Sequence, residues 1–253
     1  VSFEVAASQL GGYSLFLGAG ELQLGRGESV QDTARVLSCY LDGLALRTFS
    51  HEEQEEWARY ASIPVINALS DLFHPCQILA DILTIQEHRG SFQGAKVAYI
   101  GDGNNVAHSW LAAASTLGIH LSIASPPGYQ PHPDIVQRAR KSASRRGAQI
   151  EILEDPYLAV RGAHFLYTDV WASMGQEAEQ AQRRQAFQGY QLNRQLLAAA
   201  HEDARVMHCL PAHRGEEITN EVLEGERSLI FDEAENRLHI QKAILEWLIV
   251  EGS

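Results

Sequence analysis

Apolar positions along the chain switch repeatedly between two spacings. Short apolar runs, typical of buried strands, alternate with longer segments in which apolar residues recur every three or four positions, as on one face of a helix. The short runs predict strands at residues 12–18, 43–49, 64–69, 95–101, 119–125, 149–154, 164–171, 205–210 and 228–232. The longer segments predict helices at residues 28–41, 50–61, 74–88, 104–118, 132–147 and 234–251. Strands that alternate with helices favour parallel sheets with helices on both faces.

The tract HRGSFQGA, at residues 88–95, interrupts this alternation and indicates a division of the chain. We therefore expect an α/β fold with two doubly wound parallel-sheet domains joined by the long helix at residues 74–88. The first domain would span residues 1–90 and the second residues 91–233, and the helix within residues 234–253 would cross back to the first domain. Ligands in such folds bind at the carboxyl ends of strands, so polar residues at those ends are the candidates for chemistry.

Composition narrows the classes of partner. The net charge of -12 supplies no broad basic surface, which argues against nucleic acid and against an anionic membrane. No apolar run approaches the ~18 residues that a membrane span needs. The three cysteines, Cys39, Cys76 and Cys209, are widely spaced and include no Cys-x-x-Cys pair. We therefore expect neither a disulfide framework nor a structural zinc site. We expect a reduced, cytoplasmic compartment.

The glycine-rich turn YIGDGNNVAHSW, between a predicted strand and a predicted helix, raises the alternative of a dinucleotide site. The spacing does not fit. Gly101 and Gly103 match the first two glycines, but Val106 stands at the third position. The next strand also lacks the acidic residue that would hold a ribose. We interpret Asn104 as a helix cap and keep Asn105 as a residue that faces the ligand.

Several polar residues lie where a predicted strand gives way to a loop or a helix begins. They are Arg47, His74, Cys76, Gln77, Asn105, Asp169, Cys209 and Arg237. Each has a structural explanation when it is taken alone. Together they indicate anion chemistry without a metal, because an arginine can bind phosphate or carbonyl oxygens with two hydrogen bonds and a helix N-terminus favours negative charge. A carboxylate beside loop amides suits the head group of an amino acid.

Cys209 could be a nucleophile, a metal ligand, a substrate-binding group or a buried thiol. His208 precedes it on a predicted strand, where successive side chains point to opposite faces. We therefore expect that the two residues cannot readily bind one metal and that His208 is not a base for Cys209. A cysteine-histidine hydrolase would need another histidine, for which His74 and His213 are the candidates.

Seven segments, in order along nearly the whole chain, resemble the aspartate/ornithine transcarbamylase superfamily, and its ornithine carbamoyltransferases in particular. They are LGRGESVQDTARVLS (24–38), RTFSH (47–51), NALSDLFHPCQILADILTIQEH (67–88), GDGNNVAHSW (101–110), TDVWASMGQE (168–177), HCLPAHRGEE (208–217) and FDEAENRLHIQKA (231–243). The pattern Asp-x-x-x-Ser-Met-Gly resembles the loop that selects ornithine, whereas aspartate transcarbamylases carry a more basic loop there.

The resemblance implies transfer of a carbamoyl group from carbamoyl phosphate to the δ-amine of L-ornithine, giving citrulline and phosphate, without a cofactor or metal. It implies homotrimers. The implied carbamoyl phosphate ligands are Gln23, Arg47, His74, Pro75, Cys76, Gln77, Cys209, Leu210 and Arg237, of which Arg47, His74, Gln77, Cys209 and Arg237 are catalytic. The implied ornithine ligands are Asn105, Asp169, Ser173 and Met174. Cys209 would position the substrate and form no covalent intermediate.

The family also has a Ser-Thr-Arg-Thr-Arg phosphate loop, which would end just before Val1. The segment VSFEVAA has no capping residue at its start, so we expect that it begins within a helix and that further sequence precedes it. Two other interpretations stay open. A sister transcarbamylase could act on another amine such as putrescine, although putrescine has no amino-acid head for Asp169 to hold. A non-catalytic paralogue would not need the full set of polar residues.

Overall fold

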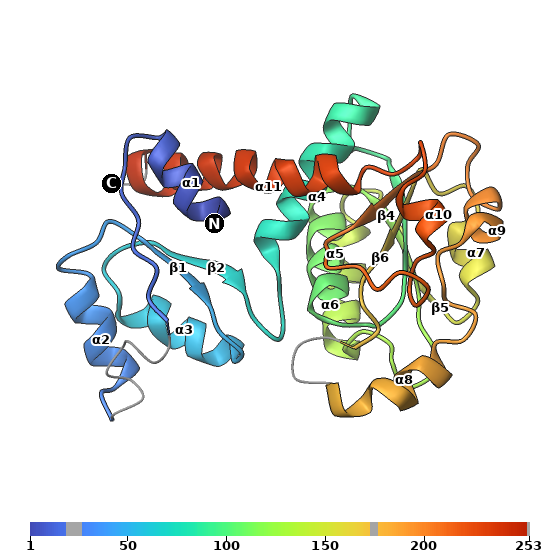
Figure 1. Cartoon of the computed structure of the whole chain (residues 1–253). Coiled ribbons are helices and arrows are strands. Elements are labelled where there is room, and N and C mark those ends of the chain that lie inside the picture. The colour runs from blue at the N-terminus through green and yellow to red at the C-terminus, as the bar shows by residue number, and fades with distance from the viewer. Residues whose placement is uncertain (19–26, 173–176, 252–253) are drawn as a thin grey trace. The chain divides into compact units, whose positions relative to one another are not determined.

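The computed structural model describes residues 1–18, 27–172 and 177–251. Contacts between residues divide the chain into two compact units, one formed by residues 1–79 with 235–253 and the other by residues 80–234. The divisions fall inside the helices α4 (Pro75–Arg89) and α11 (Ile230–Leu245), which Figure 1 labels. The two units are called unit 1 and unit 2 below.

Unit 2 is built on a parallel sheet of five strands among the described residues, in the order β5-β4-β3-β6-β7. The strands are β3 (Lys96–Ile100), β4 (His120–Ala124), β5 (Ile150–Leu153), β6 (Phe165–Thr168) and β7 (Arg205–His208). Strand order reverses at β3, because the chain first builds outward to β5 and then returns to the other side of β3 with β6. The predicted α/β class with parallel sheets is therefore confirmed, and such a switch point is where ligands bind in open sheets.

The strands of unit 2 read as continuous apolar runs because both faces of the sheet are covered. All four residues of β6 and four of the five in β3 are buried. The helices α5 (Asn105–Leu117) and α6 (Pro133–Ala143) pack against each other, and α7 (Pro156–Val160) packs against β3 and β4. The remaining helices of this unit are α8 (Gln180–Ala186), α9 (Arg194–Ala198) and α10 (Asn220–Leu223), with a short 3-10 turn at Glu177–Glu179.

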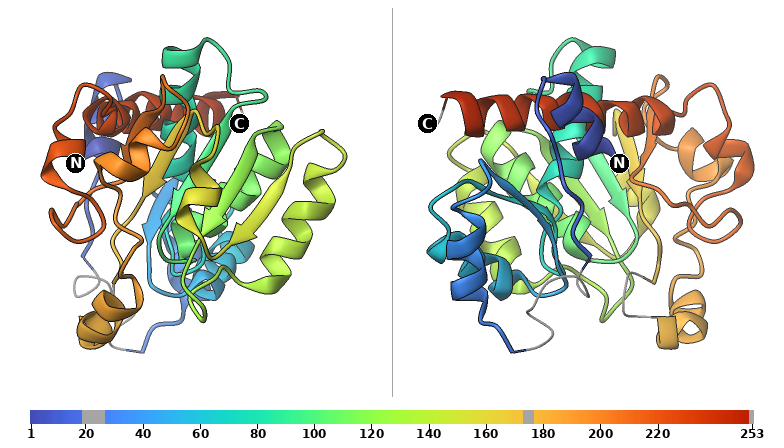
Figure 2. Two further views of the ribbon diagram at one scale, coloured as in Figure 1. Left: turned by 90° about the vertical axis from the view of Figure 1, so that its right-hand side faces the viewer. Right: turned by 60° about the vertical axis from the view of Figure 1, so that its left-hand side comes forward.

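Unit 1 contains a parallel pair of strands, β1 (Leu44–Arg47) and β2 (Val65–Leu69). The helices α2 (Val30–Leu37) and α3 (His51–Tyr60) pack against each other, and α3 packs against β2. Ala34, Leu44 and Trp57 form the buried centre of this unit. Helix α1 (Ser2–Gln9) lies beside α11 in Figures 1 and 2, and Lys242 Nζ donates to Gln9 Oε1 across 3.2 Å.

The strand predicted at residues 12–18 is not formed. These residues run as irregular backbone, and Tyr13, Leu15 and Phe16 are exposed. An apolar run becomes a strand only where a neighbouring strand takes its backbone hydrogen bonds, and no such neighbour pairs with this segment in the described part of the chain.

The strand predicted at residues 228–232 is also wrong. Leu229 N donates to Val206 O, and Val206 N donates to Arg227 O, so the segment touches the edge of β7 through a single bridge. Ile230 then begins α11, which continues into a π-helical turn at Glu246–Glu251. Leu229 and Ile230 are buried. An apolar segment that is buried at a single bridge and then continues as a helix has the same short apolar run in its sequence as a strand.

The other predicted strands are present with shorter bounds, and so are most of the predicted helices. Helix α4 keeps its predicted length and ends at Arg89, and α11 begins at Ile230, before the predicted start at residue 234. The short helices α7 to α10 had no predicted range. Strands β6 and β7 each end before the polar residues that were included in their predicted ranges. Within the described ranges, every helix is too short or too polar to cross a membrane.

Candidate active site

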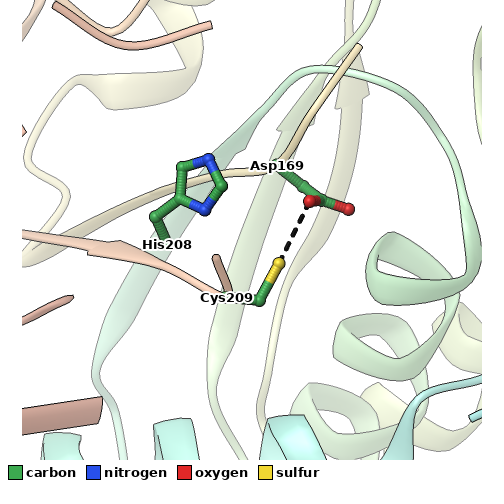
Figure 3. A group of neighbouring side chains, drawn as sticks. All are labelled: Asp169, His208 and Cys209. Atoms are coloured by element: carbon green, nitrogen blue, oxygen red, sulfur yellow. Dashed lines mark hydrogen bonds between the residues drawn. The ribbon is translucent and has the colours of Figure 1, made fainter. Parts of the chain in front are cut away.

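Asp169 and Cys209 meet at the carboxyl edge of the sheet in unit 2. Asp169 follows the last residue of β6, and Cys209 follows the last residue of β7, which is its neighbour. The Cys209 Sγ donates to Asp169 Oδ1 across 3.0 Å, as Figure 3 shows. Two residues 40 positions apart in the sequence thus form one hydrogen-bonded pair, because parallel strands end at the same edge.

The Asp169 carboxylate is fixed by two further donors. Asn104 Nδ2 donates to Asp169 Oδ2 across 2.7 Å, and Val170 N donates to Oδ1 across 2.8 Å. Asn104 also caps α5, since its Oδ1 accepts from Val106 N and Ala107 N, which confirms the interpretation from the sequence. The sequence did not indicate that Asn104 also holds Asp169. A helix cap is recognisable from neighbouring residues, whereas a contact with a distant carboxylate is not.

The environment keeps the Cys209 thiol protonated. Burial, and then the negative charge and hydrogen bond of Asp169, raise the pKa of Cys209 well above its usual range. Glu233 and Asp81 add to this effect. A thiolate is the reactive form of cysteine, so a thiol held protonated is a poor nucleophile and a suitable hydrogen-bond donor.

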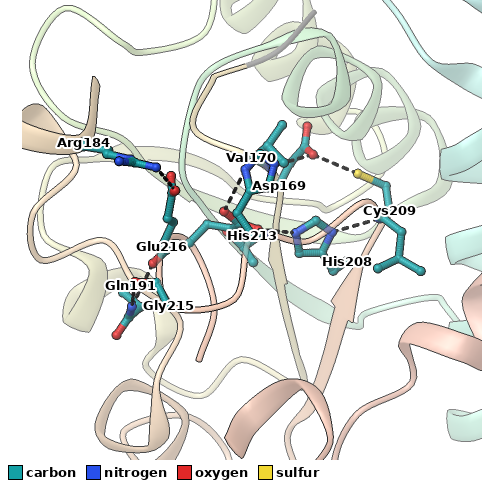
Figure 4. Close-up of polar contacts among 12 residues, drawn as sticks. Asp169, Val170, Arg184, Gln191, His208, Cys209, His213, Gly215 and Glu216 are labelled. Carbon is teal, nitrogen blue, oxygen red and sulfur yellow. Dashed lines mark hydrogen bonds and ion pairs between the residues drawn. The ribbon is translucent and has the colours of Figure 1, made fainter. Parts of the chain in front are cut away.

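His208 is a structural residue. Its ring is fully buried, Nδ1 accepts from Leu210 N across 2.9 Å, and Nε2 lies 3.1 Å from Glu217 Oε1, which is buried as well. Figure 4 labels the His208 ring and marks its polar contacts with dashed lines. Since Nδ1 accepts a backbone hydrogen, Nε2 carries the ring proton and donates it to Glu217. His208 therefore shapes the turn at Leu210, whose φ of 55 lies in the left-handed region, and is no base for Cys209.

The expectation that His208 and Cys209 are held apart was wrong. Ligand atoms of Asp169, His208 and Cys209 all lie within 4.8 Å of one another. Strand β7 ends at His208, and the alternation of side-chain directions ends with it. The Cys209 side chain can therefore point toward Asp169. The group nevertheless fits a metal poorly, because both nitrogens of His208 are engaged and the thiol is held protonated.

A buried ion pair borders the same edge of the sheet. Arg183 Nη1 donates to Asp102 Oδ2 and to Trp171 O, each across 2.9 Å, and Arg183 Nε donates to Glu179 Oε2 across 3.1 Å. Burial raises the pKa of Asp102 to about 6 against the opposing effect of Arg183. Arg183 therefore connects Trp171 and Glu179 to Asp102. Trp171 and Glu179 flank the Ser-Met-Gly motif in the sequence. Ser173 and Met174 themselves lie outside the described residues.

The sequence did not single out Arg183, Asp102 or Glu217. Charged residues on a helix or in a turn are normally solvated, and nothing local marks these as buried. The residues just before Glu217 are also held by polar contacts. Arg184 forms an ion pair with Glu216, and Gln191 Nε2 donates to Gly215 O and Glu216 O (Figure 4).

In unit 1, three of the expected residues lie close together. His74 precedes α4 and is 6% exposed, Arg47 ends β1, and Arg237 lies on α11. Burial, and then the positive charges of Arg237 and Arg47, lower the pKa of His74 to about 3. His74 is therefore a neutral imidazole at physiological pH, flanked by two cations, which is a suitable arrangement for an anion that carries a carbonyl group.

The first turn of α4 supplies the other expected residues of this unit. Pro75 begins the helix, and Cys76 and Gln77 are buried in it. Cys76 Sγ donates to Asn67 O across 3.3 Å, and burial raises the pKa of this thiol to about 11, so its side chain joins α4 to β2. Asn105 begins α5 beside Asn104, in unit 2. Gln23 lies outside the described residues.

Two family descriptions match the chain. Residues 1–87 match the carbamoyl-P binding domain of aspartate/ornithine carbamoyltransferase, and residues 93–248 match its Asp/Orn binding domain. Together the matches span nearly all of the sequence.

Similar proteins carry the same family name. The ornithine carbamoyltransferase of Gloeobacter violaceus is 59% identical over 98% of this chain and 80% of its own length, and that of Thermococcus kodakarensis is 54% identical over 97% and 78%. A solved structure of ornithine carbamoyltransferase from Pyrococcus furiosus superposes with a TM-score of 0.95 at 51% identity, over all of this chain and 80% of that one. The chain therefore belongs to the aspartate/ornithine carbamoyltransferase family.

Proposed function

We propose that this protein transfers the carbamoyl group of carbamoyl phosphate to the δ-amine of L-ornithine, giving L-citrulline and phosphate. The observation that carries the proposal is the 3.0 Å contact between Asp169, in the Asp-x-x-x-Ser-Met-Gly motif, and Cys209, in the His-Cys-Leu-Pro motif. The two motifs separately resemble those of ornithine carbamoyltransferases, and here they meet at one edge of one sheet.

Ornithine is assigned to unit 2. Asp169 holds the positively charged α-amino group, and Asn105, Ser173 and Met174 hold the rest of the amino-acid head. The Asp169 carboxylate is suited to this role because Asn104, Val170 and Cys209 fix its orientation before the ligand arrives. A carboxylate that is already held in one orientation loses little conformational entropy when a ligand binds. Putrescine lacks the α-amino acid head, so this arrangement disfavours it.

Carbamoyl phosphate is assigned chiefly to unit 1. Arg47, His74, Gln77 and Arg237 bind and polarise it. The resemblance also assigns Gln23, Pro75 and Cys76 to this ligand, together with Cys209 and Leu210 of unit 2. A neutral His74 donates a hydrogen bond to the carbonyl oxygen, which becomes more negative as the tetrahedral centre forms. Stabilisation of that oxyanion by one fixed donor contributes about 3 kcal/mol in comparable enzymes.

The reaction needs no covalent enzyme intermediate. The neutral δ-amine attacks the carbonyl carbon, a C–N bond forms, and the bond from carbon to the phosphate oxygen breaks. The amine proton leaves with the phosphate. Ornithine must first lose one proton from its δ-ammonium group, which is charged at neutral pH. The protonated Cys209 thiol contributes orientation, which is worth several kcal/mol when the reacting groups are aligned.

The assembly and location belong to the same proposal. The resemblance implies a homotrimer, and the exposed apolar side chains of unit 1, among them Tyr13, Phe16 and Trp247, offer surface for such contacts. All three cysteines are unpaired, which suits a reducing compartment such as the cytoplasm.

The test is a product assay on the purified protein. Carbamoyl phosphate is supplied with ornithine, putrescine or aspartate in parallel, and each carbamoylated product is quantified by mass spectrometry. We expect citrulline formation to exceed the other two products at least 100-fold, since a site built for a polar head group strongly rejects analogues that lack it. Preferential carbamoylation of putrescine or aspartate, or no product at all, would overturn the proposal.

A further inference from the structure

Unit 2 has a second cluster of polar side chains at the opposite edge of its sheet from Asp169 and Cys209. The cluster lines a partly open cavity of about 240 Å³. The strands β6 and β7 begin there, at Phe165 and Arg205, and the end of α4 lies beside them. The polar residues that line the cavity are His88, Arg89, His164, His201, Asp203 and Arg205. We name it the His/Arg cavity.

Backbone hydrogen bonds fix the proton positions on two of the histidines. His164 Nδ1 accepts from Lys96 N across 2.9 Å, and His201 Nδ1 accepts from Asp203 N across 3.2 Å. An imidazole nitrogen that accepts a hydrogen bond carries no proton, so the ring proton of each neutral histidine lies on Nε2. Their ring centroids are 5.2 Å apart. Nε2–H is therefore the N–H donor that each neutral ring can offer to a ligand.

This arrangement selects an anion over a metal ion. A metal would need the Nε2 lone pair, and freeing it would move the proton to Nδ1, where it would face a backbone N–H group. The arginines add positive charge in fixed positions. Arg89 Nη1 donates to Ser91 O across 2.7 Å, and Arg205 Nη1 donates to Glu226 O across 3.1 Å, so each guanidinium is anchored through one nitrogen.

Among the residues that line the cavity, Asp203 offsets one of the two arginine charges. His88 Nε2 lies 3.0 Å from Asp232 Oδ2. Burial, and then the nearby basic side chains of Arg89, His201, His120 and Lys96, lower the pKa of His164. Two arginines against one carboxylate leave a local excess of positive charge in a chain of net charge -12, and this excess favours an anion.

We propose that the His/Arg cavity is a binding site for a small phosphate-class dianion, distinct from the site of the transfer reaction. The Nε2–H groups of His164 and His201 bind its oxygens, and Arg89 and Arg205 balance its charge. The ligand is either inorganic phosphate or the phosphoryl group of a small phosphomonoester. The proposal does not depend on the identity of the transfer reaction.

The test follows the histidine ring signals by NMR, with labelled histidine in the whole protein at near-neutral pH. Inorganic phosphate and glycerol phosphate are titrated separately, and the tighter of the two identifies the source. We expect the His164 and His201 ring signals to move together in a saturable way, with a rise in the pKa of His164. The exposed His132, which caps α6, serves as an internal control that does not move. Phosphate binding in unit 1 is recorded separately, by the His74 signal.

Substitutions complete the test. Arg205→Gln and His201→Gln should each weaken phosphate binding at His164 about tenfold or more, the effect of one charge-assisted hydrogen bond. Arg138→Gln, which removes an exposed arginine on α6, should leave it unchanged. The proposal is overturned if neither probe gives a saturable shift at His164 and His201, or if binding survives both cavity substitutions undiminished.

Discussion

The side chain of Asp169 accepts hydrogen bonds from an asparagine cap, a backbone amide and a thiol, and all three donors lie within unit 2. A carboxylate with this many donors is held in one orientation by its surroundings before a ligand binds. The thiol is the weakest of the three donors, so it is the contact that yields most readily when a substrate binds.

Asp169→Asn should therefore impair ornithine use selectively. The amide oxygen can still accept from Val170 N and Cys209 Sγ, but the charge that attracts an α-ammonium group is lost. We expect the KM for ornithine to rise about 100-fold, in line with the ~2–3 kcal/mol of a charged hydrogen bond, and the Kd of carbamoyl phosphate to change little. Steady-state kinetics and calorimetry measure the two quantities, and equal losses for both substrates would contradict the assignment.

Cys209→Ser should leave a folded, slower enzyme. A hydroxyl can still donate to Asp169, but its shorter bond to carbon shifts the donor, and misplacement of that kind lowers kcat by up to about 100-fold. Cys39→Ser, at an exposed cysteine, is the matched control and should retain full activity. Detection of a carbamoyl thioester on Cys209 by mass spectrometry during turnover would show that the thiol is a nucleophile instead.

His74 should make stability depend on pH. Its pKa falls from 6.5 in the unfolded chain to about 3 in the folded protein, so the unfolded state binds more protons between these values. The free energy of unfolding is therefore highest above about pH 6.5 and decreases as the pH falls toward about 3. This histidine alone should lower it by about 2 kcal/mol between about pH 7.5 and pH 5.

Urea unfolding at these two pH values measures the effect. His74→Gln should reduce the difference in unfolding free energy between them by about that amount, and His132→Gln, at an exposed histidine, should not. An unchanged pH dependence in His74→Gln would mean that the imidazole is not held neutral by its surroundings.

At the scale of the element, the turn between β3 and α5 is decided by packing. Gly101 has a φ of 147, and a side chain at Gly103 would place its Cβ only 2.2 Å from Pro131 N and 2.3 Å from Gln130 C. Gly103 N also donates to Tyr129 O across 2.8 Å. Of the two glycines that raised the question of a dinucleotide site, Gly103 thus allows the close approach of the segment at residues 129–131, and Gly101 adopts a positive φ that favours glycine.

Gly103→Ala should destabilise unit 2 strongly, because the clash is with backbone that a side-chain rotation cannot relieve. We expect a loss of about 3 kcal/mol or more in unfolding free energy. Gly162→Ala is the matched control, since that glycine has a φ of 69 and open space around its Cβ position. It should cost only the ~1–2 kcal/mol of a left-handed alanine. Equal losses in thermal or urea unfolding would show that the segment at residues 129–131 can move aside.

At the scale of the whole molecule, exposed apolar side chains are concentrated in unit 1. They include Tyr13, Leu15, Phe16, Tyr40 and Trp247, whereas unit 2 exposes fewer large apolar residues among those described. Apolar side chains gathered on one part of a protein mark surface that a partner covers. We expect this surface to form the contacts of the proposed homotrimer.

Sedimentation equilibrium tests the assembly. The protein should sediment as three copies of the chain, and Phe16→Asp should shift the distribution toward smaller species. Tyr157→Asp, at an exposed aromatic residue of unit 2, should not. A monomer at micromolar concentration, or a trimer insensitive to Phe16→Asp and to Trp247→Asp, would contradict this use of the surface.

The sequence by itself determined the fold class and most of the elements. Buried parallel strands such as β3 and β6 need apolar side chains on both faces, and amphipathic helices need a repeating face, so both leave a periodic signal. The segments at residues 12–18 and 228–232 show the limit of this periodic signal. An apolar run does not indicate which neighbouring segment will pack against it or pair with it. The residues at the ends of β6 and β7 were also found from the sequence, since parallel topology brings strand ends to one edge.

Only the tertiary structure decided how those residues are connected. The contacts of Asn104 with Asp169, of His208 with Glu217 and of Arg183 with Asp102 join positions 65, 9 and 81 residues apart. The His/Arg cavity likewise gathers residues from α4, β7 and the segments before β6 and β7. Hydrogen-bonded pairs of this kind leave no period in the sequence, because each partner is compatible with a solvated position until the fold buries both together.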